Sequence, residues 1–78
     1  MSYAAKDIQQ IDSVSVISET CDDGKLSFEV EAVVVLKDGR KISEYFEWVR
    51  ASQLAALQSF DPSNPEHVNN IQDLFDRW

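Results

Sequence analysis

Cysteine, glycine and basic residues are scarce in this chain, and each shortage excludes a class of protein. A single cysteine, Cys21, rules out an internal disulfide and any zinc site built on several cysteines. Two glycines are too few for a phosphate-binding loop, and no nucleotide-binding motif occurs. Seven Lys and Arg residues do not form the clustered basic surface that direct binding of nucleic acid requires.

Long hydrophobic runs are also missing. The longest unbroken apolar run, 32–36, is far shorter than the roughly 20 residues that a membrane-spanning helix needs. The first residues contain no apolar segment of signal-peptide length. We therefore expect neither secretion nor a membrane partner, and the lone cysteine favours the reducing cytoplasm.

What is present is a small acidic domain. The 78 residues predict one domain spanning 1–78, and 44% hydrophobic with 27% charged residues is typical of a soluble globular protein. Fourteen acidic side chains against seven basic ones give a net charge of -7. This charge favours partners with basic surfaces.

The strongest strand pattern lies at 26–36, where Phe28, Val30, Ala32, Val34 and Leu36 alternate with Glu29 and Glu31. The turn sequences Asp22-Asp23-Gly24 and Lys37-Asp38-Gly39 flank it. It should therefore be the middle strand of an antiparallel meander, between a strand at 11–20 and another at 41–49. The third segment could also begin a helix, because its aromatic residues run on into Ala51.

The lengths of the two turns decide which side chains share a face. If each is a three-residue turn with a left-handed glycine, Cys21 faces Lys25, and Val16 and Val14 lie opposite Val30 and Ala32. The second turn then places Leu36 opposite Arg40, and the following pairs are Val34–Ile42, Val30–Phe46 and Phe28–Trp48. A two-residue second turn would instead oppose Val30 to Glu47, so the apolar pattern favours three residues.

Two helices should follow the strands. Ala51, Leu54, Leu57 and Phe60 recur at three-residue spacing before Asp61-Pro62. Asn64-Pro65 predicts the start of a second helix, whose apolar stripe contains Val68, Ile71, Leu74, Phe75 and Trp78. Residues 1–10 fit either a flexible arm or a short helical turn.

The predicted fold class is α+β, a three-stranded antiparallel β-meander with two C-terminal helices packed on one face (βββαα). The helices should cover the face that carries Val14, Val16, Phe28, Val30, Val34, Ile42 and Phe46. Glu44 shares this face and is expected at an edge that reaches water, while Trp48 and Trp78 are expected in the core or at its rim.

Few residues point to catalysis, and we expect no catalytic residue, cofactor or metal ion. Asp22 and Asp23 follow Cys21 directly, so their charges disfavour the reactive thiolate. His67, the only histidine, has no catalytic partner at a suggestive spacing. Paired carboxylates are abundant, but nothing in their order indicates a cleft that would hold two of them in different environments.

The sheet face away from the helices is the predicted binding site. It should carry Glu29 directly opposite Glu47, a repulsive arrangement that a basic partner would relieve. The expected contact residues are Glu19, Glu29, Glu31, Glu47, Tyr45, Val33 and Val35. A face that is simply solvated explains the same carboxylates.

These patterns favour a non-enzymatic module that binds a basic protein surface. In its most specific form it is an inhibitor that imitates nucleic acid, since carboxylates on one strand face recur about every 6.6 Å. Small phage proteins that block host defences offer an analogy. A homo-oligomeric scaffold, with a homodimer as its simplest form, is the second hypothesis, and a small enzyme is a remote third.

Overall fold

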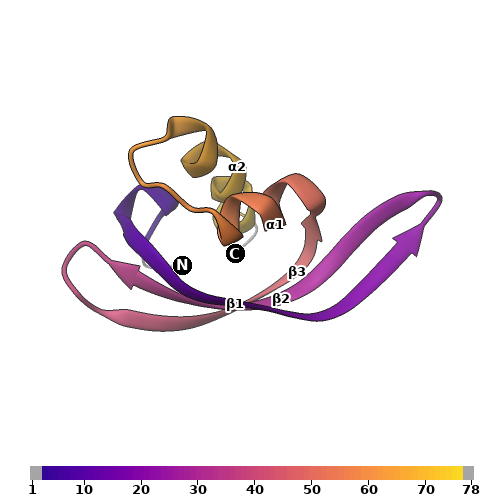
Figure 1. Cartoon of the computed structure of the whole chain (residues 1–78), viewed down its shortest axis with the longest axis horizontal. Helices are drawn as coiled ribbons and strands as arrows, with labels where there is room; N and C mark the ends of the chain where they lie inside the picture. Colours follow the sequence, from indigo (N-terminus) through magenta and orange to yellow (C-terminus); the bar gives the residue numbers. More distant parts are fainter. Residues whose placement is uncertain (1–2, 77–78) are drawn as a thin grey trace.

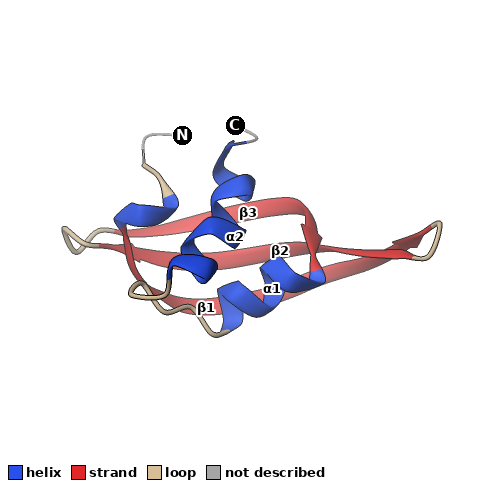
Figure 2. Ribbon diagram, turned by 90° about the horizontal axis from the view of Figure 1, so that it is seen from above, coloured by secondary structure: helices blue, strands red, loops and turns tan. Residues whose placement is uncertain are grey.

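The computed structural model describes residues 3–76 and has the predicted βββαα architecture (Figure 1). A 3-10 turn, η1, at Ala5–Asp7 leads into β1 (Ile8–Asp22), β2 (Lys25–Leu36) and β3 (Lys41–Arg50). The helices α1 (Ala51–Gln58) and α2 (Pro65–Asp76) follow. The antiparallel sheet has the order β1-β2-β3, and both helices lie on one face of it (Figure 2).

The alternation in β2 builds the core. Every second residue from Val30 to Leu36 is buried against the helices, because successive strand side chains point to opposite faces. Phe46 of β3 packs edge-on against Phe75 of α2, with ring centroids 5.4 Å apart. The remaining buried members come from all other elements: Ala5, Ile8, Val49, Ala56, Leu57, Ile71 and Leu74.

The turn between β2 and β3 confirms the three-residue prediction. The Gly39 amide donates to the Leu36 carbonyl at 2.9 Å, and the Leu36 amide donates to the Arg40 carbonyl at 2.8 Å. Gly39 has φ 93°, a left-handed conformation that glycine adopts without steric cost. Val34–Ile42 and Val30–Phe46 pair as predicted.

The turn between β1 and β2 does not have the predicted length. Asp22 pairs with Lys25, so only Asp23 and Gly24 form the turn, and Cys21 faces Leu26 rather than Lys25. Both turn residues have positive φ, 51° and 74°, as a type I′ hairpin turn requires. Asp-Gly suits this turn as well as it suits the three-residue one.

A bulge at Ile17 then restores the predicted register from Val16 to Ser13, and the pairing shifts again between Ile11 and Ser13 and between Ile8 and Gln10. The pairing shifts between Val16 and Ser18, so Val16–Val30 and Val14–Ala32 pair as expected. Between the bulge and the turn, however, the alternation is reversed. Glu19 pairs with Phe28 and therefore lies on the helix-facing side of the sheet, contrary to the prediction.

A bulge in β3 changes the position of Trp48. The strand is extended to Arg50 as predicted, but the register shifts between Phe28 and Val30, and Phe28 pairs with Val49 instead of Trp48. Val49 is fully buried, whereas Trp48 has φ 57° and is 61% exposed. The prediction that Trp48 belongs to the core or its rim is therefore wrong; Trp78 lies outside the described residues.

The N-terminal segment from residue 3 onward is part of the fold. Its short helical turn, η1, matches one of the two predicted alternatives, and Ala5 and Ile8 are fully buried. The Ala5 amide donates to Gln72 Oε1 of α2 at 2.9 Å. Glu44 lies on the edge strand β3 and is half-buried, and burial of Tyr3 together with this carboxylate raises the pKa of Tyr3.

The helices follow the sequence pattern with one exception. In α2, the Asn64 side chain accepts a hydrogen bond from the Glu66 amide at 3.0 Å and caps the helix as predicted. In α1, Gln53 is buried while Ala51 is exposed. The Gln53 amide nitrogen donates to the Asn70 carbonyl at 3.2 Å and to Asp73 Oδ2 at 3.1 Å, which links α1 to α2.

Candidate protein-binding face

The sheet face turned away from the helices, here called the outer face, is built from rows of side chains across the three strands. Ser15, Glu31 and Tyr45 form the central row, and Ser13, Val33 and Ser43 form the next. The outer face comprises these two rows together with Ser18, Glu29, Val35, Lys41 and Glu47. The predicted site residues Glu29, Glu31, Val33, Val35, Tyr45 and Glu47 thus share one surface.

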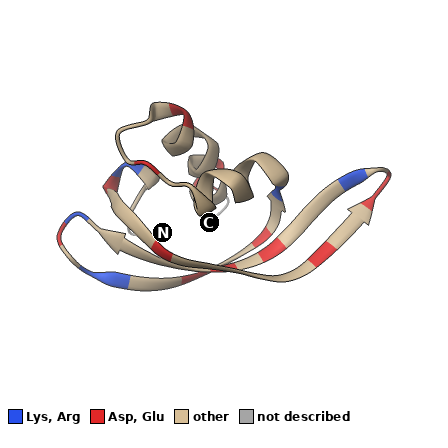
Figure 3. Cartoon of the chain, in the orientation of Figure 1, with Lys and Arg blue, Asp and Glu red and all other residues tan. Residues whose placement is uncertain are grey.

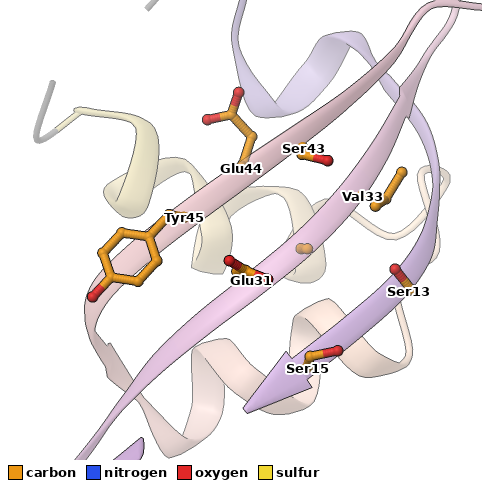
Figure 4. A pocket seen from close by; sticks show the side chains of 8 residues that line it. Ser13, Ser15, Glu31, Val33, Ser43, Glu44 and Tyr45 are labelled. Atoms are coloured by element: carbon orange, nitrogen blue, oxygen red, sulfur yellow. The ribbon is translucent and has the colours of Figure 1, made fainter. Parts of the chain in front are cut away.

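A shallow hollow surrounds Glu31 (Figure 4). Its volume is about 240 Å³, and serines from β1 and β3 flank the Glu31 carboxylate while the Tyr45 ring lies to one side. The hollow forms because the serine side chains on β1 and β3 are shorter than those of Glu31 and Val33, which lie between them on β2. Because Glu44 pairs with Ala32, its side chain belongs to the opposite face although its residue borders the hollow.

Hydrogen bonds hold the Tyr45 ring in place. Its hydroxyl donates to Glu29 Oε2, and the other oxygen of this carboxylate accepts a bond from Ser18 Oγ at 2.9 Å. The bond from Tyr45, with that from Ser18, lowers the pKa of Glu29. The same bond to Glu29, together with the charge of Glu47, raises the pKa of Tyr45 to about 12. The hydroxyl thus remains a hydrogen-bond donor at neutral pH.

Glu29 and Glu47 lie on the same side of the sheet but are not the simple opposed pair of the prediction. The bulge places two residues, Glu47 and Trp48, opposite Glu29. Glu29 and Glu47 line one hollow of about 130 Å³ together with Thr20 and Trp48. The Tyr45 hydroxyl donates to Glu29 and lies close enough to Glu47 for that charge to contribute to the raised pKa of Tyr45.

The far end of the outer face is partly covered. Lys41 Nζ lies 3.0 Å from Asp12 Oδ2, an ion pair that joins the two edge strands, and Gln10 donates to the same carboxylate at 2.7 Å. The bond from Lys41 lowers the pKa of Asp12. Val33 and Val35 are accordingly half-buried, so they add less apolar surface than the sequence indicates.

The structure thus removes one predicted site residue and adds two that the sequence pattern missed. Glu19 leaves the outer face because of the Ile17 bulge, and Ser18 takes the place beside Glu29. Trp48 joins the border of the site. A bulge has no distinctive residue signature here, so the pattern contained no signal for either change.

Residues 3–76 also include the side chains that were considered for metal binding or catalysis. No group of three or more His, Cys, Asp or Glu side chains is arranged to hold a metal ion within this range. His67 Nδ1 accepts a hydrogen bond from the Asp61 amide at 3.1 Å, a contact that stabilises the loop before α2. Cys21 is exposed on the first hairpin. No helix in the same residues is long and apolar enough to cross a membrane.

Comparison of the chain with protein-family models, with curated proteins and with solved structures found no match.

Proposed function

We propose that this protein is a non-enzymatic module that binds a basic protein surface through its outer face. The observation that carries the proposal is the Glu31 hollow, where a carboxylate stands between serine hydroxyls and an immobilised aromatic ring. A lysine or arginine side chain entering the hollow would gain a charge-assisted hydrogen bond to Glu31. A second cation lying over the outward face of the Tyr45 ring, next to the hollow, would gain a cation–π contact.

The charge distribution supports the same partner. Within residues 3–76, the ion pairs are Arg40–Asp38, Lys41–Asp12 and Arg50–Asp73, so none involves Glu29 or Glu31. Acidic positions recur along the sheet, while basic positions lie towards its ends (Figure 3). The net charge of -7 would further accelerate association with a basic surface.

The most specific form of the proposal is an inhibitor that occupies a groove built for nucleic acid. Glu29 and Glu31 are successive outward residues of β2, which places them about 6.6 Å apart along the strand. Glu47 adds a third carboxylate from β3. With Glu19 on the other side, the acidic row is shorter than the sequence predicts, so a short basic groove fits better than a long one.

Affinity capture at low and high salt tests the proposal. The tagged protein should capture a basic partner from extracts of its native cell or of that cell's target, and the interaction should weaken steeply as salt rises. The triple variant E29Q/E31Q/E47Q should lose the partner. The matched triple variant E19Q/D23N/E66Q removes the same charge from exposed positions elsewhere and should retain it.

If both triple variants lost the partner equally, net charge alone would explain binding. That result would overturn the proposal that the outer face is the binding site. Binding that is insensitive to salt would overturn the electrostatic mechanism. Turnover of a substrate that depends on His67 or Cys21 would revive the enzyme hypothesis instead.

A further inference from the structure

The first hairpin extends beyond the rest of the sheet. The last pair between β2 and β3 is Ser27–Arg50, whereas β1 and β2 continue to Asp22–Lys25. Residues 21–26 are therefore two-stranded; together with the base pair Thr20–Ser27 they are here called the hairpin arm, and Figures 1 and 2 show the arm projecting past both helices. A two-stranded hairpin is marginally stable in water without further packing. Contact with a partner would therefore stabilise the hairpin arm.

An open groove lies at the base of the arm. It measures about 690 Å³ and is lined by residues from the arm, from the end of β3 and from the start of α1: Asp22, Lys25, Leu26, Ser27, Trp48, Arg50, Ala51 and Ser52. Leu26 is 40% exposed and Trp48 is 61% exposed. Large apolar side chains gathered at an open groove are typical of a contact surface.

The backbone at Trp48 adds a second indication. Its φ of 57° is left-handed, a conformation that a bulky residue adopts only when the surroundings enforce it. The bulge that enforces it directs Val49 into the core and leaves the indole at the groove.

We propose that two copies of the chain associate through this groove in a two-fold symmetric dimer. A two-fold contact brings the same patch from each copy together, so the patch must be complementary to itself. The rim of the groove contains the acidic Asp22 and the basic Lys25, so opposite charges can meet across the axis, while Arg50 at the same rim already pairs with Asp73. The outer face has carboxylates at its centre, and two such faces would repel each other.

Sedimentation equilibrium tests the proposal over a range from about 10 µM to about 1 mM protein. The wild-type chain should approach twice its mass of 8.9 kDa at the upper end. L26E should weaken association by about tenfold or more, since it places two carboxylates in the apolar contact. N69E adds the same charge at an exposed position of α2 that does not line the groove, and should associate within about twofold of wild type.

Circular dichroism should show that both variants remain folded, because Leu26 and Asn69 are exposed in the monomer. A wild-type protein that stays monomeric at about 1 mM would overturn the proposal, as would equal effects of L26E and N69E. A monomer that instead binds another protein at Leu26 would assign the groove to a different occupant. The Glu31 hollow shares no lining residue with this groove, so failure here leaves the proposed function intact.

Discussion

The two faces of the sheet consist of the same three strands, yet they differ in burial and in charge. On the helix side, Val30 and Val34 are fully buried, and Phe46 packs against α2. On the outer face, the neighbouring residues Glu29 and Glu31 carry charge, and Val33 is half-buried at most. The helix-side residues stabilise the fold by their burial, whereas the carboxylates of the outer face remain in contact with solvent.

The largest expected effect concerns the helix side of β3. Replacing Phe46 by Ala should lower the free energy of unfolding by about 3–5 kcal/mol, because it removes a buried ring and leaves a cavity against Phe75. Such a loss approaches the entire stability of a small domain. Urea denaturation followed by circular dichroism measures it.

The matched control is S43A, on the outer face of the same strand, which should change the free energy of unfolding by no more than about 0.5 kcal/mol. Similar losses in the free energy of unfolding for F46A and S43A would contradict this difference between the faces, since the outer face would then contribute to stability as much as the core does.

A smaller effect is expected at the one buried polar residue described in the core. Gln53 accepts a hydrogen bond from the Arg50 amide at 2.9 Å and donates to Asn70 and Asp73 of α2. Q53L should cost about 1–3 kcal/mol, because these groups lose partners while apolar volume is retained. Q58L, at an exposed position of the same helix, is the control. If Q53L is as stable as wild type, apolar packing alone fixes the two helices.

The smallest expected effect on stability concerns Tyr45 on the outer face, where a titration is the more sensitive measurement. The pKa of Tyr45, raised to about 12, should fall towards about 10 in E29Q, because the variant removes the charged acceptor of the hydroxyl. The ring ¹³Cζ resonance of Tyr45 reports this ionisation. An unchanged pKa in E29Q would mean that Glu29 does not fix the ring.

The signs of these pKa shifts define two pH windows. Since folding raises the pKa of Tyr45, its stabilising contribution is complete below about pH 10 and is lost as pH rises through about 12. Since folding lowers the pKa of Glu29, its contribution is present above about pH 4.3 and is lost as pH falls through the folded-state value. At neutral pH both contributions are present.

Much of the fold could be predicted because apolar alternation is a strong constraint. In β2 the run from Phe28 to Leu36 determines the buried face, and the apolar residues of β3 then select the three-residue second turn. The cap at Asn64 and the buried stripe of α2 follow from local chemistry in the same way. These features each depend on residues close in sequence or on one repeated period.

The errors in the prediction arise from bulges, which change the period by one residue. The Asp-Gly sequence permits turns of two or three residues, and the shorter turn is compensated by a bulge at Ile17. Because the two changes cancel, Val14 and Val16 keep their predicted partners. Glu19 lies between the bulge and the turn and is therefore on the other face. Likewise, Val49 rather than Trp48 is buried in the core. Both residues are apolar, so only their packing in three dimensions decides which of them is buried.

The most direct test of the central claim is to map where a basic ligand contacts the folded protein. A nona-arginine peptide should perturb the amide resonances of Ser15, Glu31 and Tyr45 most strongly, and these shifts should diminish when salt is raised from about 50 to about 500 mM. E31Q should abolish the localised response while leaving weak contacts elsewhere. Perturbations centred on Glu19 or Glu66, or unchanged in E31Q, would contradict the assignment of binding to the outer face.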